Sequence, residues 1–202
     1  MADLIGSANF PIVSPTAFMG VAKVTVTSEK APGQEYICIG SNAKMSICNR
    51  YGQDPSSSMS IASAFEAAVL CGAIKDGEQV YVNLYPVTLK LKGASEGLAV
   101  ILAMLGFDMV KADVMATGYV DSFGIRVMDM NGLLSLKIRP VDGLNHKIQG
   151  AIDAKLSLFI VPACEFAQHA GKFADAPPKC VKLVRTLGEA MKALDSHIGR
   201  QQ

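Results

Sequence analysis

The chain has 202 residues, of which 50% are hydrophobic and 18% charged, and its formal net charge is +1. These values exclude a disordered chain and a coiled coil, and without a basic run they give no electrostatic reason to expect nucleic acid or an anionic membrane as a partner. No apolar stretch approaches the roughly 18 residues that a membrane span needs, so we expect one soluble domain with a large core.

The first residues predict an arm followed by a hairpin of two strands. Residues 1–16 contain Gly, Asn, Ser and two prolines, so we expect them to form an N-terminal arm ahead of a single domain over 17–202. Residues 17–27 alternate between apolar and polar side chains, as a strand does. A turn sequence at 31–34 then leads to the expected return strand at 36–39.

The middle of the chain predicts two helices separated by a strand. The polar residues 54–58 end in a helix cap, and the apolar side chains that follow predict a helix over about 59–74. Residues 80–85 predict a strand, and a loop over 86–93 leads to a second helix at about 95–105.

The rest of the chain predicts further strands and two more helices. Residues 112–120 predict a strand, and the Asn-Gly pair within 129–132 favours a tight hairpin turn between two others. A third helix is expected over about 143–155, a short buried strand over 158–161, and a closing helix with apolar residues at helical spacing over 181–194. This order predicts an α+β fold, in which helices pack on a mixed sheet.

The sharpest local feature is the sequence Gly-Ala-Ser-Glu-Gly at 93–97, where a loop meets the second helix. Glycine lets the backbone approach a substrate closely, and the free N–H groups of a first helical turn can face a developing oxyanion. Ser95 is therefore a candidate nucleophile. The same serine would suit the N-cap of the helix, and the local sequence leaves both interpretations open.

A candidate base lies in the third helix. Leu144 and Ile148 mark the apolar face of this helix, and Lys147 lies on the flank of that face. Partial burial there would lower the pKa of the lysine and allow its neutral amine to take a proton from a serine hydroxyl. The alternative is a surface lysine whose aliphatic stem covers apolar side chains.

Histidines, acidic residues and cysteines suggest no competing site. The histidines lie in no recognisable arrangement with a serine or cysteine, and aspartates near turns are expected there for backbone reasons. The cysteines are odd in number and include no CxxC pair, so we expect reduced thiols, no metal and no other cofactor. These residues are His146, His169 and His197; Asp121, Asp129 and Asp142; and Cys38, Cys48, Cys71, Cys164 and Cys180.

Several segments, taken in order, resemble the proteolytic domain of Lon proteases and the related polyprotein-processing proteases of birnaviruses. Val-Tyr-Val at 80–82 and the Gly-Ala-Ser-Glu-Gly segment are similar to the strand and nucleophile segment of that family. Lys-Ala-Asp-Val-Met-Ala-Thr-Gly at 111–118 is similar to its Ala-Asp-Val-Ala-Met-Thr-Gly strand. Asp-Gly-Leu-Asn-His-Lys at 142–147 and the later Phe-Ile-Val-Pro are similar to its lysine helix and following strand. The likeness covers about residues 17–195.

The resemblance implies a Ser-Lys catalytic dyad. Ser95 aligns with the nucleophile, Lys147 with the general base, and Thr117 with a strand threonine that helps to hold the dyad. For the oxyanion we expect the backbone N–H of Ser95 together with a neighbouring donor, at Glu96 or Gly93. An extended substrate is expected beside a strand, with 80–94 as the wall of its site.

The chain departs from the family pattern near the dyad. Ala94 replaces the usual proline, and Glu96 replaces a small residue, so that Glu96 is expected either to bias substrate choice or to disturb the oxyanion site. Tyr119 stands where Lon has a glutamate, and Asp142 replaces a glycine. The segment before the third helix is about ten residues longer than in Lon, which makes Lys137 a competing lysine, expected to point away from the buried side.

The predicted function is that of a serine endopeptidase that needs no ATP, because the chain has no Gly-x-x-x-x-Gly-Lys-Ser/Thr phosphate loop and no room for an ATPase module. We expect a polypeptide substrate, with its own precursor as a candidate, and favour a viral enzyme in the host cytoplasm. A mature product and an excised domain both fit the sequence. The alternative is a non-catalytic binding or assembly domain of the same fold. Neither nucleic acid nor a membrane is an expected partner, and the sequence does not predict the oligomeric state.

Overall fold

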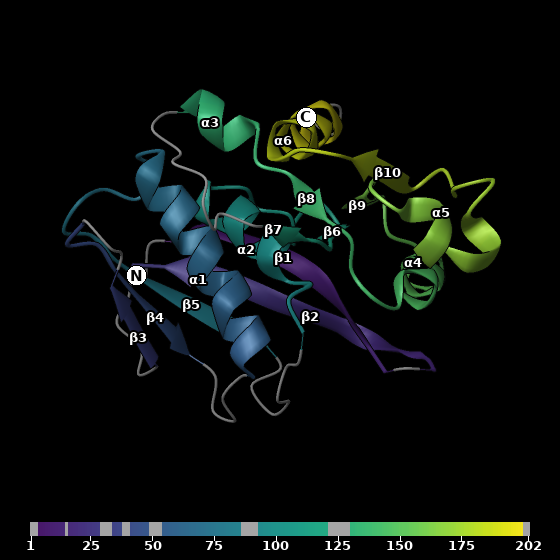
Figure 1. Ribbon diagram of the computed structural model, residues 1–202, viewed down its shortest axis with the longest axis horizontal. Helices are drawn as coiled ribbons and strands as arrows, with labels where there is room; N and C mark the ends of the chain where they lie inside the picture. Colours follow the sequence, from purple (N-terminus) through teal and green to yellow (C-terminus); the bar gives the residue numbers. More distant parts are fainter. Residues whose placement is uncertain are drawn as a thin grey trace.

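The computed structural model describes residues 4–14, 16–28, 34–37, 41–48, 54–85, 93–120 and 130–199. These residues confirm the predicted α+β class, because helices pack on a mixed eight-stranded sheet with strand order β10-β9-β6-β1-β2-β5-β4-β3 (Figure 1). The strands of this sheet are β1 (Leu4–Val13), β2 (Phe18–Thr27), β3 (Gln34–Ile37), β4 (Lys44–Cys48), β5 (Gln79–Tyr85), β6 (Val114–Ala116), β9 (Leu158–Pro162) and β10 (Val181–Val184).

A short second sheet and the helices complete the described fold. The second sheet pairs β7 (Tyr119–Val120) with β8 (Ile138–Arg139) in antiparallel fashion. The helices are α1 (Pro55–Leu70), α2 (Gly97–Met104), α3 (Met130–Leu134), α4 (Leu144–Asp153), α5 (Phe166–His169) and α6 (Leu187–Ile198), with a 3-10 turn η1 (Gly171–Phe173).

The strands alternate between two cores on opposite faces of the sheet. In β6, Val114 and Ala116 belong to the larger core, whereas Met115 between them belongs to the smaller one. Because successive side chains of a strand point to opposite faces, the two cores must lie on the two sides of the sheet. Helices α1, α2 and α6 contribute to the larger core, and α4 and α5 to the smaller one. Figure 1 shows α1 crossing in front of the strands and α4 and α5 grouped near β9 and β10.

Helix α2 is apolar on every side because it lies within the larger core. All eight of its residues are buried, and it packs both against α1 and against β1. A helix that is hydrophobic all round is typical of such a position. The start of α2, two residues after Ser95, is therefore fixed by packing on two sides.

The beginning of the chain differs from the prediction. Residues Leu4–Val13 form β1, a central strand between β2 and β6, where an arm was expected. The two prolines suggested an arm, but Pro11 is tolerated because β6 pairs with β1 only at Asn9, so no ladder bond to β6 is lost. The predicted hairpin is also wrong: β2 pairs with β1 and β5, while β3 pairs with β4.

Two later elements also differ from their predictions. Asn131 and Gly132 lie inside α3 and not in a hairpin turn; residues 121–129, which would have held one of the flanking strands, lie outside the described residues. The closing helix begins at Leu187, because Val181–Val184 form the edge strand β10. The side chain of Thr186 accepts a hydrogen bond from Glu189 N, which is the N-cap that starts α6.

Candidate active site

The end of strand β6 is the point at which helices from the two faces of the sheet meet. Thr117 N donates to Ile160 O at 3.0 Å, which continues the pairing of β6 with β9. Gly118 then turns the chain toward α2: its N–H donates to Ser95 O at 2.9 Å, and Leu98 N donates to Gly118 O at 2.9 Å. Gly118 has φ of +154°, and a Cβ there would collide with Ile138 Cγ2, so this junction requires glycine.

Ser95 lies at this junction with a partly exposed side chain. It is not the N-cap of α2, because that position is occupied by Glu96, and no side chain caps the helix. The local interpretation of Ser95 as a helix cap therefore does not describe this fold. The segment before it is held from α1, because Ser60 Oγ donates to Ala94 O at 2.9 Å.

Lys147 approaches the same junction from the opposite face of the sheet. It lies on the buried side of α4 with Leu144 and Ile148, and only 2% of its surface is exposed, so it is more deeply buried than the flank position suggested. Its Nζ donates to Thr117 Oγ1 at 3.2 Å, and that hydroxyl donates to Ser95 O at 3.2 Å. Thr117 thus connects the two predicted dyad residues, although no hydrogen bond among the described atoms joins Lys147 Nζ directly to Ser95 Oγ.

Burial controls the protonation of Lys147. Removal from water lowers the pKa of Lys147 from 10.5 to about 8, and the negative charges of Glu96 and Asp142 oppose part of this shift. An ammonium group loses more solvation than a neutral amine does when it is buried, which gives the direction of the shift. A lysine with such a pKa is partly neutral near physiological pH and can accept a proton.

Glu96 is a second buried ionisable group beside Ser95. Only 2% of its surface is exposed, and burial raises the pKa of Glu96 to about 7. The nearby Ser57 hydroxyl stabilises the carboxylate and so opposes this rise. Among the described residues, however, neither Ser57 Oγ nor Glu96 Oε1 has a hydrogen bond of ordinary geometry. A carboxyl group without a full set of partners favours its neutral form.

The three backbone donors expected for an oxyanion are not equivalent. Gly93 N donates to Asp54 Oδ2 at 3.2 Å and is therefore engaged with a carboxylate. The N–H of Glu96 faces its own carboxylate and stabilises it. Ser95 N has no acceptor among the described residues. Ser95 N is thus the donor that this arrangement leaves available.

Ser95 and Lys147 line one cavity of about 580 Å³. Its other lining residues are Val13, Gly93, Ala94, Tyr119, Pro140, Val141, Asp142, Glu165 and His169. Sequence reasoning missed Glu165 and set His169 aside; they are the N-cap and the last residue of α5, a helix that it did not predict. His169 Nε2 lies 3.5 Å from Glu165 Oε2, one helical turn away, so the one available signal was an acidic residue four positions before a histidine. Lys137, the competing lysine, is exposed, as its alternating segment predicted.

Strand β5 does not form the expected wall for a substrate strand. It pairs with β2 on one side and with β4 on the other, so neither of its edges is free to add a strand. Of the predicted wall over 80–94, the residues that line the cavity are Gly93 and Ala94, and residues 86–92 lie outside the described residues.

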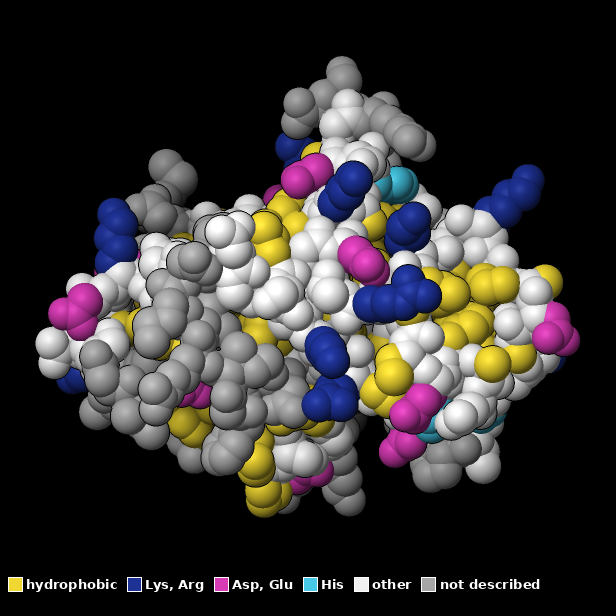
Figure 2. Space-filling model, turned by 45° about the horizontal axis from the view of Figure 1, so that its top comes forward, with side chains coloured by type: hydrophobic (Ala, Val, Ile, Leu, Met, Phe, Trp, Pro, Cys, Tyr) yellow, Lys and Arg dark blue, Asp and Glu magenta, His cyan; other side chains and the backbone are white. Residues whose placement is uncertain are grey.

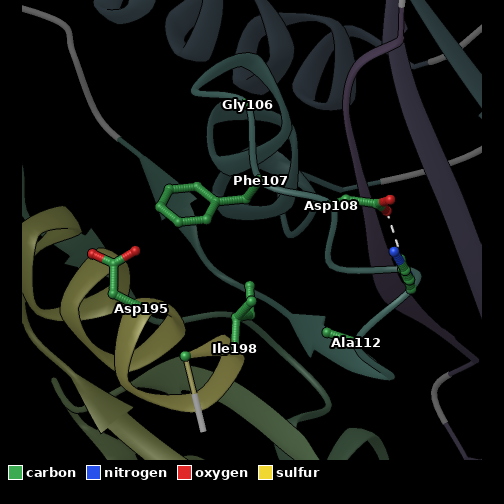
Figure 3. A pocket seen from close by; sticks show the side chains of 8 residues that line it. Gly106, Phe107, Asp108, Ala112, Asp195 and Ile198 are labelled. Atoms are coloured by element: carbon green, nitrogen blue, oxygen red, sulfur yellow. Dashed lines mark hydrogen bonds between the residues drawn. The ribbon is translucent and has the colours of Figure 1, made fainter. Parts of the chain in front are cut away.

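Two other cavities of similar size lack a buried ionisable pair. One, of about 640 Å³, lies between the segment after α2 and helix α6 (Figure 3). There Asp108 is held structurally, because its Oδ1 accepts hydrogen bonds from Ser7 Oγ at 2.5 Å and from Lys111 N at 3.4 Å.

The other cavity, of about 620 Å³, is lined by cationic side chains near edge strand β10, namely Lys179, Lys182, Arg185 and Lys192. Figure 2, in which the top of the molecule is turned forward, shows basic side chains gathered near the middle of the face, with acidic ones among them. Charged side chains on an edge strand oppose pairing with a further strand.

The described part of the chain offers no metal centre. No group of three or more His, Cys, Asp and Glu side chains in it could hold a metal ion. Of the cysteines that the structure describes, Cys71, Cys164 and Cys180 are free thiols. Among the described helices, none is both long and apolar enough to cross a membrane.

Comparison of the sequence with protein-family models finds no match, and comparison with curated proteins finds none either. The likeness to the Lon-type proteolytic domain therefore stays a prediction from the quoted motifs. The function of the chain is inferred from its residues and their geometry.

Proposed function

We propose that the chain is a serine endopeptidase in which Ser95 is the nucleophile and Lys147 the general base. The observation that carries the proposal is a buried lysine with a pKa of about 8 in the same cavity as a partly exposed serine. About one lysine in ten with this pKa is neutral at pH 7, whereas an ordinary lysine is almost entirely charged. A deeply buried lysine beside a serine suits nucleophilic catalysis better than it suits stability.

The proposed reaction passes through an acyl-enzyme. Neutral Lys147 Nζ takes the proton of Ser95 Oγ as that oxygen bonds to the scissile carbonyl carbon, and the carbonyl oxygen becomes an oxyanion near Ser95 N. The Lys147 ammonium then gives its proton to the leaving amine as the C–N bond breaks. Lys147 next deprotonates a water molecule, which attacks the ester and releases the acid, and the proton returns to Ser95 Oγ.

Thr117 is proposed to position the base. Its hydroxyl accepts from Lys147 Nζ and donates to Ser95 O, so it ties the amine to the backbone of the nucleophile. Rotation of the Lys147 side chain from Thr117 Oγ1 to Ser95 Oγ would form the reacting pair, a tightening that is common when substrate binds.

The substrate is proposed to be a polypeptide, with the precursor of the chain as the first candidate. The resemblance to birnavirus polyprotein-processing proteases favours this substrate and the cytoplasm of a host cell as the compartment. No part of the proposed reaction calls for ATP, a metal or another cofactor. The competing function is a non-catalytic binding or assembly domain.

The test is mass spectrometry of a peptide library and of the precursor after incubation with wild type, Ser95→Ala and Ser196→Ala. We expect the Ser95→Ala variant to lose cleavage by about 10³-fold or more, because the nucleophile is absent. The Ser196→Ala variant is the matched control, since Ser196 is exposed on α6. It should cleave as wild type does.

Circular dichroism and urea unfolding establish that both variants fold. Equal cleavage by wild type and the folded Ser95→Ala variant would contradict the proposed Ser95–Lys147 dyad. A wild-type protein that cleaves nothing would favour the binding domain.

A further inference from the structure

Glu96 is a buried carboxyl group that the proposed reaction does not use. It directly follows Ser95 and occupies the N-cap of α2, where free backbone N–H groups favour a negative charge. Burial nevertheless favours the neutral carboxyl group more strongly than the helix favours the charged one. Only 2% of the residue is exposed, and Oε1 has no hydrogen-bond partner among the described residues. A fully buried glutamate without a complete set of hydrogen-bond partners is rare in proteins, because burial of its charge is costly.

Charged and polar groups of two other elements act on Glu96, and one further carboxylate acts on Lys147. Lys147 of α4 stabilises the carboxylate, and the carboxylate in turn stabilises the Lys147 ammonium. Asp54, the N-cap of α1, disfavours the ionised form of Glu96, while Ser57 of α1 favours it. Asp142, in the segment before α4, also favours the Lys147 ammonium, but it is exposed to solvent.

Of the two negative charges that act on Lys147, the buried carboxylate of Glu96 has a stronger effect than that of Asp142. Water screens the exposed carboxylate of Asp142, whereas both Glu96 and Lys147 are only 2% exposed. The Lys147 amine is also held near Glu96 through the backbone, because it reaches Ser95 O by way of the Thr117 hydroxyl. One proton gained or lost by Glu96 therefore changes the electrostatic potential at Lys147.

We propose that Glu96 is a positioning residue whose charge decides how firmly Lys147 holds its proton. An ionised Glu96 stabilises the ammonium form of Lys147, which cannot act as a base. A neutral Glu96 lets Lys147 lose its proton at a lower pH and become the neutral amine that can act as a base. The catalytic consequence rests on the proposed function, but the coupling of the two titrations does not. A purely structural Glu96 would affect stability and leave the titration of Lys147 unchanged.

The first test follows the ¹⁵N resonance of Lys147 Nζ by NMR as pH is raised, with the signal assigned from Lys147→Met. In Glu96→Gln we expect the midpoint to fall by about one pH unit, because a neutral amide of the same shape replaces the charge. The matched control is Glu35→Gln on β3, at the far edge of the sheet, which should leave the midpoint in place. An unchanged midpoint in Glu96→Gln would overturn the proposal.

The variant Asp142→Asn distinguishes the effect of an exposed charge on Lys147 from the effect of the buried charge of Glu96. It should lower the Lys147 midpoint by less than Glu96→Gln does, and added salt should abolish its effect because dissolved ions screen a charge that is exposed to solvent. The effect of Glu96→Gln should persist at 0.5 M salt. If salt abolishes the effect of both variants equally, the buried coupling is refuted.

A reciprocal measurement keeps the proposal testable if Glu96→Gln does not fold. Coupling between two protonation sites is mutual, so the Glu96 carboxyl must respond to Lys147 as strongly as Lys147 responds to Glu96. The ¹³C carboxyl resonance of Glu96 should titrate about one pH unit higher in Lys147→Met than in wild type. The same Glu96 midpoint in both proteins would also overturn the proposal.

Activity measurements distinguish this proposal from the proposed function. If the wild type cleaves peptides, the acid limb of its pH profile should move to lower pH in Glu96→Gln, by the same amount as the Lys147 midpoint. If the wild type cleaves nothing and the Lys147 midpoint still falls, the coupling stands and the peptidase is refuted. If cleavage occurs and both the limb and the midpoint stay in place, the coupling is refuted and the peptidase stands.

Discussion

Among the described residues, Thr117 is the side chain that hydrogen-bonds both to Lys147 and to the backbone of Ser95. It is fully buried, and its hydroxyl accepts a hydrogen bond from Lys147 Nζ and donates one to Ser95 O. Ser95 O also accepts from Gly118 N, so the backbone there stays held when the hydroxyl is removed. The more serious loss falls on Lys147, whose ammonium would be buried without this acceptor.

We therefore expect Thr117→Val, which keeps the shape and removes the hydroxyl, to lower the free energy of unfolding by about 1–3 kcal/mol at neutral pH. Peptide cleavage should fall by about 10- to 100-fold, because the base is no longer aligned. Thr117→Ser retains the hydroxyl, so its free energy of unfolding and its cleavage rate should both be close to those of wild type. Urea unfolding and cleavage rates measure the two effects, and a Thr117→Val variant as active as wild type would show that the threonine does not position the base.

The structure places the two residues predicted for the dyad, Ser95 and Lys147, along one cavity, whereas the surroundings of that cavity were not predicted. Ser95 and Lys147 were found from local patterns, a serine between glycines at a helix start and a lysine beside an apolar helix face. The burial of Glu96 could not be predicted, because a glutamate near a helix N-terminus is normally solvated. Its burial follows from the position of α2 between α1 and the sheet, which involves residues distant in sequence.

At the level of elements, the predictions failed where two structures fit the same pattern. The apolar residues over 181–194 repeat at helical spacing, yet their first part is strand β10, because the Thr186–Glu189 cap starts the helix only afterwards. The Asn-Gly pair at 131–132 suits a hairpin turn, but it lies within α3. Local propensity is overridden in such cases by packing, since α3 contacts α6 and must follow its surface.

The contact between α1 and the start of α2 is close enough to require glycine at position 97. A Cβ on Gly97 would collide with Ser60 Oγ, the atom that donates to Ala94 O and holds the segment before Ser95. We expect Gly97→Ala to lower the free energy of unfolding by about 1–3 kcal/mol through overpacking. It should also slow cleavage, because the nucleophile segment moves with Ser60.

A double-mutant cycle tests this contact. Ser60→Ala alone should cost about 0.5–1.5 kcal/mol for the lost hydrogen bond. In the double variant the added methyl group occupies the space of the missing hydroxyl, so the combined cost should be smaller than the sum of the two single costs. Chemical unfolding of the four proteins measures the cycle. Additive costs would show that the two elements do not meet at this point.

For the whole molecule, the α+β class was predictable from the order of the elements, whereas the strand order was not. The order places β1 between strands that come from later parts of the chain, and the pairing of β1 with β6 joins Asn9 to Met115. Such long-range pairing leaves no local signal in the sequence. The same pairing positions the end of β6 between α2 and α4, so the candidate site depends on contacts that local patterns do not contain.

The two buried ionisable groups should also shape the pH dependence of stability. Glu96 has a pKa of about 7 in the folded chain and 4.5 as its ordinary value, so the folded state holds the extra proton between these values and stability falls as pH rises from 4.5 to 7. Lys147 has a pKa of about 8 in the folded chain and 10.5 as its ordinary value, so the unfolded state holds the extra proton and stability rises with pH above about 8.

We therefore expect a minimum in the free energy of unfolding between pH 7 and 8, with slopes of up to about 1.4 kcal/mol per pH unit on either side. Burial also raises the pKa of the Cys48 and Cys71 thiols above 9.0, so these thiols make stability fall with pH above that value. The rise in stability that is due to Lys147 alone is therefore expected between pH 8 and 9. Urea unfolding from pH 5 to 9 measures the curve. Glu96→Gln should remove the falling slope and Lys147→Met the rising one, because each variant deletes one of the two titrations. A wild-type stability that is flat or maximal between pH 7 and 8 would mean that these groups are solvated in the folded chain, and the buried base would then be lost from the proposed mechanism.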